Sequence, residues 1–239
     1  MEREVIGFLA HTKNIKKILS YGLNPKRSEK MKKIKRNGVL VVISSPSGTG
    51  KTTICKKLIA NDKNLYLSIS VTTRKKRDRE ADGIDYFFKS KTDFLKLKSE
   101  KSFIETAIVF DNYYGTLKNQ VMDKLENGID VIIDIDWQGT RQINTFMKGN
   151  VVKIFLLPPS LEELFNRLSS RGSESLKEID FRMSKAIKEI KHFDEYDYVL
   201  INSDVDEVYK KINKIIYSER MKLSRQIGIR EFIGDLTKN

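Results

Sequence analysis

The residues of this chain whose types and spacing best suit a chemical role form a loop rich in glycine, serine and threonine. Residues 44–52 read Ser-Ser-Pro-Ser-Gly-Thr-Gly-Lys-Thr and lie between an apolar run at residues 39–43 and a helical pattern at residues 53–60. This order is typical of a phosphate-binding loop, because backbone N–H groups in the turn and the positive end of the helix both attract anionic oxygens. We expect Lys51 to reach the β- and γ-phosphates of a nucleotide and the Thr52 hydroxyl to help hold Mg²⁺.

One position of this loop departs from the usual pattern. Ser45 stands where the motif has its first glycine, so a residue with a Cβ atom must accept the backbone geometry of the turn there. The alternative interpretation is a glycine-rich turn without a chemical role. We favour nucleotide binding, because the apolar run, the loop residues and the helical pattern occur together. The expected phosphate-binding residues are Ser45, Pro46, Ser47, Gly48, Thr49, Gly50, Lys51 and Thr52.

The length and composition of the chain limit the kinds of protein it can be. Its 239 residues suffice for one domain with insertions or for two small domains, and 39% of them are hydrophobic. No apolar run approaches the length that a bilayer crossing needs, and the N-terminal residues lack the apolar core of a signal peptide. One cysteine, Cys55, and two histidines, His11 and His192, argue against a disulfide and against a Cys/His metal site. We therefore expect a cytoplasmic protein without a membrane partner.

The net charge of +13 raises the question of nucleic-acid binding, so its distribution matters. Residues 1–37 hold eleven Lys and Arg and three Glu, a net charge of +8, which leaves +5 for the rest of the chain. An excess of that size suits an enzyme with polyphosphate substrates as well as it suits a nucleic-acid binder. We therefore do not expect nucleic acid as a main partner, and we interpret residues 1–37 as a basic N-terminal extension. A natural start at Met31 is an alternative, and the sequence predicts no oligomeric state.

From Gly38 onward, strand-like and helix-like patterns alternate along the chain. Such alternation, with several strands that are continuous apolar runs, predicts an α/β fold around a parallel sheet. Between residues 72 and 116 the pattern changes to short, mixed, turn-rich segments, which indicates an inserted subdomain. The expected strands are residues 39–44, 67–71, 131–135, 151–157 and 198–201, and the expected helices are residues 53–60, 118–127, 161–169, 179–191 and 205–226.

A second group of residues suited to anion binding follows the strand expected at residues 67–71. Arg74 and Arg77 lie three residues apart in a charged segment, and Tyr86 follows them. Two guanidinium groups and a phenol could hold an anion through several hydrogen bonds. From charge alone, a solvated basic loop is the simpler interpretation.

Further motifs follow one another in a recognisable order. They are the loop at residues 45–52; Thr73, Arg74, Arg77, Glu80, Gly83, Asp85, Tyr86 and Phe88; residues 103–105 and 112–116; residues 134–139; and residues 157–164 and 167–172 with Arg182 and residues 197–202. Through these motifs the chain resembles the guanylate kinase family, which moves the γ-phosphoryl group of ATP onto GMP. The resemblance covers residues 38–220 and turns the charged segment after residue 70 into a candidate substrate site.

The resemblance implies a P-loop NTPase-type parallel sheet flanked by helices. Inserted into it would be a small mixed α/β GMP-binding subdomain at residues 70–116 and a helical lid over ATP at residues 161–192. The core of the domain would comprise residues 38–69, 117–160 and 193–239.

The resemblance also implies which residues bind GMP. Arg74, Arg77, Tyr86 and Tyr114 would hold its phosphate, and Glu80 would orient the arginines. The full set of expected GMP contacts is Ser70, Arg74, Arg77, Glu80, Tyr86, Glu105, Tyr114, Thr116 and Asp136.

Recognition of the base would depend on Glu105, which would accept the N1–H and N2–H₂ groups of guanine. Ser70 and Thr116 would donate to guanine O6, and Asp136 would add an acceptor near the exocyclic amine. Adenine would leave Glu105 desolvated and facing an acceptor at N1, which is unfavourable by several kcal/mol.

Catalysis would depend on positively charged residues and no general base, because phosphoryl transfer needs charge neutralisation more than covalent help. The expected catalytic residues are Lys51, Arg74, Arg171 and Arg182. Arg167 is either a further lid arginine or an ordinary cation on a helix surface.

The remaining implied roles concern ATP and the metal ion. Asn202 would contact adenine, with a turn-forming asparagine as the alternative. Asp134 would be either a Mg²⁺-linked carboxylate or a structural acceptor beside the loop. The implied reaction is in-line transfer from ATP to GMP and dGMP with Mg²⁺, giving ADP and GDP. The alternatives are a non-catalytic interaction module of the same fold and a kinase of the same fold with a different acceptor.

Overall fold

The structure is a computed structural model and describes residues 34–78, 80–109, 111–170 and 175–237. The chain divides into two compact units. The larger unit spans residues 37–222, and the smaller unit contains, among the described residues, residues 34–36 and 223–237. Most of the predicted N-terminal extension, residues 1–33, lies outside the described part.

A five-stranded parallel sheet forms the centre of the larger unit, in the order β10-β9-β2-β8-β3. Its strands are β2 (Leu40–Ser44), β3 (Leu65–Leu67), β8 (Asp130–Asp134), β9 (Val152–Leu157) and β10 (Tyr198–Ile201). Every residue of β2 is buried, as a continuous apolar run predicts for a strand covered on both faces. Because the strands are parallel, β2 and β8 end at the same edge of the sheet, where Ile43 pairs with Asp134.

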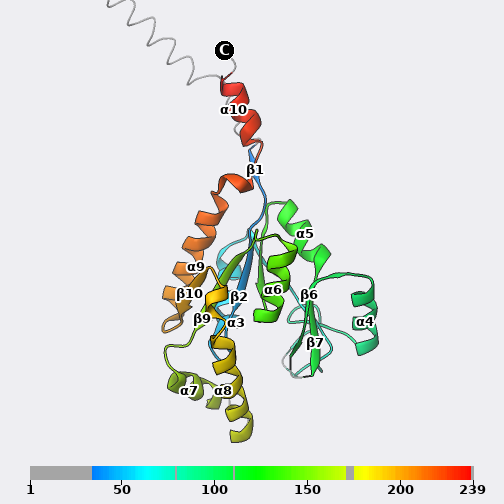
Figure 1. The fold of residues 1–239 in the computed structure, drawn as a ribbon, viewed down its shortest axis with the longest axis vertical. Helices are drawn as coiled ribbons and strands as arrows, with labels where there is room; N and C mark the ends of the chain where they lie inside the picture. Colours follow the sequence, from blue (N-terminus) through cyan, green and yellow to red (C-terminus); the bar gives the residue numbers. More distant parts are fainter. Residues whose placement is uncertain (1–33, 79, 110, 171–174, 238–239) are drawn as a thin grey trace, which may run out of the picture. The chain divides into compact units, whose positions relative to one another are not determined.

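Helices cover both faces of this sheet (Figure 1). Successive side chains of β2 point to opposite faces: Val41 and Ile43 join one apolar core, and Leu40 and Val42 join the other. The first core includes side chains of α3 (Lys51–Asn61) and α9 (Val205–Arg220), and the second includes side chains of α5 (Lys118–Glu126) and α6 (Trp137–Phe146). This arrangement confirms the predicted fold class.

A second, mixed sheet lies within the segment expected as an insertion. Its order is β5-β4-β7-β6, in which β4 runs parallel to β5 and antiparallel to β7, and β6 and β7 form an antiparallel pair. The elements are β4 (Val71–Thr72), β5 (Phe87–Phe88), α4 (Lys91–Ser99), β6 (Phe103–Val109) and β7 (Asn112–Leu117). The fully buried Phe94 of α4 stacks on Phe103, with ring centroids 4.7 Å apart, and so holds the helix on the sheet.

The segment expected as a lid contains two helices, α7 (Leu161–Ser169) and α8 (Leu176–Ile190). They share a small apolar core of Leu164, Leu168, Ile179 and Ala186. Helix α8 begins with a capping box in which Ser175 and Glu178 satisfy each other's backbone N–H groups. After α8 comes the short 3₁₀ helix η1 (Phe193–Glu195).

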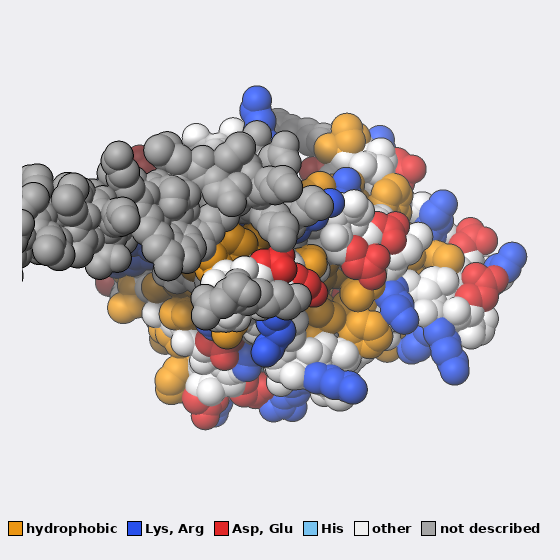
Figure 2. Space-filling model, turned by 90° about the horizontal axis from the view of Figure 1, so that it is seen from above, with side chains coloured by type: hydrophobic (Ala, Val, Ile, Leu, Met, Phe, Trp, Pro, Cys, Tyr) orange, Lys and Arg blue, Asp and Glu red, His pale blue; other side chains and the backbone are white. Residues whose placement is uncertain are grey.

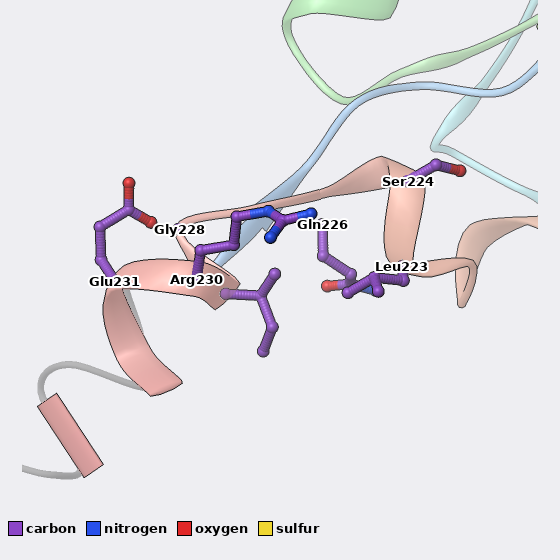
Figure 3. A pocket seen from close by; sticks show the side chains of 7 residues that line it. Leu223, Ser224, Gln226, Gly228, Arg230 and Glu231 are labelled. Carbon is purple, nitrogen blue, oxygen red and sulfur yellow. The ribbon is translucent and has the colours of Figure 1, made fainter. Parts of the chain in front are cut away.

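The smaller unit contains β1 (Lys35–Arg36), η2 (Leu223–Arg225), β11 (Gln226–Ile227) and α10 (Ile229–Thr237), with β1 antiparallel to β11. A hollow of about 450 Å³ is lined by residues between Leu223 and Glu231. Figure 3 shows the Arg230 side chain extended toward Gln226 from the start of α10.

Two predicted elements were wrong in extent. The range expected as one strand at residues 67–71 links the end of β3 to the start of β4, because the chain leaves the central sheet after β3 and enters the mixed sheet at β4. The helix expected at residues 205–226 ends at Arg220, whose guanidinium donates to Asp62 and Asp130 at 2.5 and 2.6 Å. Helices α4, α6 and α10 were not predicted.

Charged side chains of both signs are mixed on the surface. On the face that Figure 2 presents, Lys and Arg side chains of the described residues are interspersed with Asp and Glu side chains. Among the described residues, none of the helices combines the length and the apolar character that a bilayer crossing requires.

Candidate active site

The phosphate-binding loop connects the end of β2 to the start of α3, as its sequence predicts. Gly48 and Gly50 have φ of 93° and 98°, which is left-handed backbone that residues with a Cβ rarely adopt. A Cβ at Gly50 would lie 2.8 Å from Nδ2 of Asn202, and one at Gly48 would lie 3.0 Å from Leu164 and Leu168 of α7. Both glycines are therefore required by backbone conformation and by the close approach of neighbouring segments.

Ser45 does not strain the loop. Among the described residues, the non-glycine residues with positive φ are Lys101, Asp111 and Lys148, and Ser45 is not one of them. The Ser45 hydroxyl donates to the carbonyl oxygen of Pro46 at 3.1 Å. The first position of this loop therefore accepts a side chain without a backbone penalty.

Lys51, the first residue of α3, forms an ion pair with Asp134 at the end of β8. Its Nζ lies 2.5 Å from Oδ1 of Asp134. Burial would lower the pKa of Lys51, but the charge and the hydrogen bond of Asp134 raise it above its ordinary value. The amine is therefore a firmly protonated cation that a carboxylate holds at the loop.

The residues expected at the metal have the chemistry that Mg²⁺ prefers. Thr52 is exposed at the start of α3, and the Asp134 side chain is about one-third exposed. Mg²⁺ takes oxygen ligands and commonly uses one or two protein groups together with substrate phosphates and water. A hydroxyl and a carboxylate beside a phosphate-binding loop fit that pattern.

Between β4 and β5, Glu80 holds the segment that carries Arg74 and Arg77. Its Oε1 accepts from Nη2 of Arg74 at 2.7 Å and its Oε2 accepts from the backbone N–H of Arg77 at 2.9 Å. The hydrogen bond from Arg74 holds the pKa of Glu80 below its usual value. The Arg74 guanidinium lies 5.3 Å from the ring centre of Tyr86, and Tyr86 lies edge-on to Tyr114 with centroids 6.0 Å apart. Four residues predicted to hold one phosphate thus form a connected group with Glu80.

Glu105, on β6, is the most deeply buried carboxylate of the candidate site. It is 3% exposed, and its Oε1 accepts a hydrogen bond from the Thr116 hydroxyl at 2.7 Å. Burial raises the pKa of Glu105 to about 7, with the charge of Asp136 adding to the rise and the Thr116 bond opposing it. The Thr116 proton is directed at Glu105 here, so its predicted donation to guanine O6 would require that bond to rearrange.

Asp136 stands close to Glu105 because it caps α6. Its side chain accepts from the Gly139 N–H at 3.0 Å, and a Cβ at Gly139 would lie 2.9 Å from Oε2 of Glu105. The helix start and the buried carboxylate can approach each other only because residue 139 is glycine. Ser70, also predicted here, is half-buried just before β4.

The comparisons with known proteins agree with this geometry. Residues 37–219 match the family model described as Guanylate kinase. The chain is 48% identical over 204 residues to the guanylate kinase of Zymomonas mobilis, covering 85% of this chain and 94% of that protein. It is 50% identical over 192 residues to that of Rickettsia prowazekii, covering 80% and 96%. The chain belongs to the guanylate kinase family.

Solved structures support the same family. The crystal structure of guanylate kinase from Anaplasma phagocytophilum matches with a TM-score of 0.72 at 39% identity, covering 84% of this chain and 95% of that one. The family places this chain among the ATP:GMP phosphotransferases, as its motifs predict, and nothing in these comparisons favours a non-catalytic module. Residues 220–239 lie beyond the segment that matches the guanylate kinase model.

In this member of the guanylate kinase family, two of the residues predicted to act on ATP, Asn202 and Arg182, contact the phosphate-binding loop. Asn202 is 2% exposed and donates from Nδ2 to the carbonyl oxygen of Thr49 at 2.6 Å. Its Oδ1 is buried and has no hydrogen-bond partner among the described residues. Arg171 lies outside the described residues, whereas Arg182 of α8 reaches the loop, with Nη1 3.4 Å from Oγ of Ser47.

Sequence reasoning undervalued Arg167. Its guanidinium donates to the carbonyl oxygens of Thr49 and Asn202 at 3.3 and 3.2 Å and to Glu163 at 2.8 Å. It is therefore a bridge between α7, the loop and the end of β10. A helical position one turn after Glu163 predicts the salt bridge, but only the tertiary fold brings the loop to it.

Glu189 of α8 was not predicted at all. Burial raises its pKa to about 7, with Lys51 lowering it and Asp136 raising it. This end of α8 therefore lies in the electrostatic environment of the phosphate-binding loop.

Proposed function

We propose that this chain transfers the γ-phosphoryl group of ATP to GMP, and to dGMP, with Mg²⁺, and that its two halves hold the two nucleotides. The observation that carries the proposal is Glu105. A buried carboxylate is unfavourable unless a ligand supplies donors for it, and guanine presents two donors on one edge. The loop alone would suit many nucleotides, whereas Glu105 selects guanine.

The ATP half would be the loop at residues 45–52. Its backbone N–H groups and the start of α3 would bind the phosphates, and Lys51 would exchange Asp134 for β- and γ-phosphate oxygens. Mg²⁺, when bound, neutralises charge on those oxygens, and Thr52 and Asp134 are the groups placed to hold it. Asn202 would contact adenine, and its Oδ1, which is buried without a partner among the described residues, would have to become exposed to accept from the adenine amine.

The GMP half would be the subdomain at residues 70–116, which contains the mixed sheet. Arg74, Arg77, Tyr86 and Tyr114 would bind the phosphate, with Glu80 fixing the arginines before the ligand arrives. This organisation in advance reduces the entropy lost on binding.

The base would be recognised by Glu105 in its ionised form. Its pKa of about 7 describes the pocket without a ligand, and two donors from guanine would favour the carboxylate and lower that pKa. Asp136 would accept from the exocyclic amine and Ser70 would donate to O6. GMP binding is therefore expected to release a proton near neutral pH.

Transfer itself would require alignment and charge neutralisation, with no protein base. Arg182 already touches the loop through Ser47, and Arg74, which is paired with Glu80, would contact the acceptor phosphate. We propose Lys51, Arg74, Arg171 and Arg182 as the catalytic cations and residues 161–192 as the segment that closes over ATP. A cytoplasmic location, where ATP and GMP occur, fits this function.

A coupled kinase assay with ATP and Mg²⁺ tests the proposal. GMP and dGMP should be phosphorylated, while AMP, CMP and UMP should react slower by orders of magnitude. Turnover of AMP at the rate of GMP would refute the role of Glu105. Turnover of another acceptor alone would favour the same-fold kinase, and turnover of none would favour the interaction module.

A further inference from the structure

Four side chains form a closed cluster at the end of α8, outside the residues assigned to either nucleotide. Trp137 and Arg141 lie one turn apart on α6, and His192 and Glu195 follow α8. The rings of Trp137 and His192 stack with centroids 3.9 Å apart and planes 11° apart. The Arg141 guanidinium lies 4.7 Å from the centre of the Trp137 ring.

We call this cluster of four side chains the clamp. Its charged members complete a closed ring of contacts among the four. Arg141 donates from Nε and Nη2 to the two oxygens of Glu195 at 2.7 and 2.6 Å. Nδ1 of His192 lies 2.6 Å from Oε1 of the same carboxylate. The hydrogen bond from Arg141, assisted by His192, lowers the pKa of Glu195 to about 2, so the carboxylate remains charged across the neutral range. A bidentate pair combined with a ring stack has one well-defined geometry, unlike an ordinary surface ion pair.

Gln142, the residue after Arg141 on α6, fastens this helix to the GMP half. Gln142 accepts from the Thr106 N–H at 3.0 Å and donates to the Thr106 carbonyl at 2.8 Å. Thr106 follows Glu105 on β6, and Asp136 caps the same helix. Helix α6 thus has a fixed position relative to the guanine-recognising carboxylate, and the clamp joins the end of α8 to that fixed helix.

The clamp holds the C-terminal end of α8, the helix that carries Arg182 to the phosphate-binding loop. His192 comes two residues after the helix ends at Ile190, and Arg182, within α8, touches Ser47 of the loop. A shift at the anchored end would move Arg182 from the loop, and displacement of about 1 Å in a catalytic group can slow a reaction about a hundredfold.

We propose that the clamp is the anchor about which α8 is positioned for phosphoryl transfer, and that Arg141, His192 and Glu195 are positioning residues. The proposal rests on the proposed function, since it assigns them an effect on the transfer step. The clamp includes none of the residues assigned to ATP or GMP, so its loss should slow transfer while leaving the binding of both nucleotides nearly unchanged.

The test compares Glu195→Gln and Arg141→Gln with the exchange variant Arg141→Glu/Glu195→Arg. Single-turnover GDP formation should be about tenfold slower in each single variant, with KM for GMP and ATP within about twofold of the original chain. The exchange variant should regain part of the rate, because it restores an ion pair. The matched control is Asp206→Asn, which removes the exposed ion pair between Lys57 of α3 and Asp206 of α9; its rate should be unchanged.

The fluorescence of Trp137, the single tryptophan of the chain, gives a second readout. Glu195→Gln and Arg141→Gln should change its emission, and Asp206→Asn should not. An unchanged single-turnover rate in both single variants overturns the proposal, and so does a loss of rate that the exchange variant leaves unimproved. If the original chain phosphorylates no nucleotide, the proposed function fails and the clamp's assigned effect fails with it. If the original chain is active and both single variants transfer phosphate at its rate, only the proposed role of the clamp is overturned.

Discussion

Replacement of Glu105 by glutamine should weaken GMP phosphorylation and stabilise the folded chain. A glutamine side chain at this position would keep an oxygen for the Thr116 hydroxyl, but its amide would present N–H₂ where guanine needs an acceptor. A hydrogen bond to a charged group contributes about 1.5–3 kcal/mol, and a buried donor facing a donor costs about 1–3 kcal/mol more. We therefore expect a loss of about 3–5 kcal/mol in kcat/KM for GMP, which corresponds to between two and four orders of magnitude.

Glu105→Gln should raise the free energy of unfolding, although it lowers kcat/KM for GMP. The pKa of Glu105 is raised from 4.5 to about 7 in the folded chain, so the folded state holds a proton that the unfolded state releases between these pH values. The contribution of Glu105 to the unfolding free energy should therefore fall as pH rises from about 4.5 to 7, by about 3 kcal/mol. Glutamine cannot ionise, so Glu105→Gln should be more stable than the original chain at pH 8, by up to about 3 kcal/mol, and nearly equal to it at pH 4.5.

The assay combines urea unfolding at pH 4.5, 6 and 8 with GMP kinetics at pH 8. The control is Glu126→Gln, which changes an exposed carboxylate of α5 and should alter stability by less than about 0.5 kcal/mol at each pH. Equal stability of Glu105→Gln and the original chain at pH 8 would refute the raised pKa. Retention of GMP selectivity by the variant would refute the assignment of guanine recognition to Glu105.

Four further predictions concern the phosphate-binding loop. Lys51→Ala should reduce turnover with every acceptor by at least about a hundredfold, because it removes the loop cation, and comparable turnover in the coupled assay would contradict this role. Ser45→Gly should leave KM for ATP within about twofold and lower the unfolding free energy by up to about 1 kcal/mol, since Ser45 has ordinary φ and glycine gains entropy when unfolded; a markedly weaker affinity would show that the hydroxyl has a further role. Gly50→Ala should lower both thermal stability and ATP affinity, because it combines a φ of 98° with a clash at Asn202, and normal affinity would exclude this loop geometry. Arg167→Gln should raise KM for ATP severalfold through loss of its bonds to the loop carbonyls, whereas an unchanged KM would return it to the class of surface cations.

The chain's local patterns account for much of what the structure shows. Continuous apolar runs predicted the buried strands β2, β8 and β9, and the glycine-rich turn between a strand and a helix predicted the phosphate-binding loop. The strands and the loop could be predicted because each depends on residues that are neighbours in the sequence. A strand buried on both faces requires a continuous apolar run, and left-handed backbone in the loop favours glycine. The order of motifs was enough to indicate the family. The domain boundaries and the assigned site residues remain predictions.

The tertiary structure decided the properties that depend on distant segments. Residues 67–71, which read Leu-Ser-Ile-Ser-Val, resemble a single strand, yet the chain changes sheets there. Arg167 resembles a surface cation until the loop and the end of β10 approach it, and Trp137 stacks on His192, which lies 55 positions further along the chain. The ionisation of Glu105 likewise follows from burial and from Asp136, which lies 31 positions away in the sequence. Local sequence determines which backbone shapes and charges a residue can have, but the electric field and the contacts at each site come from chain segments that only the fold brings together.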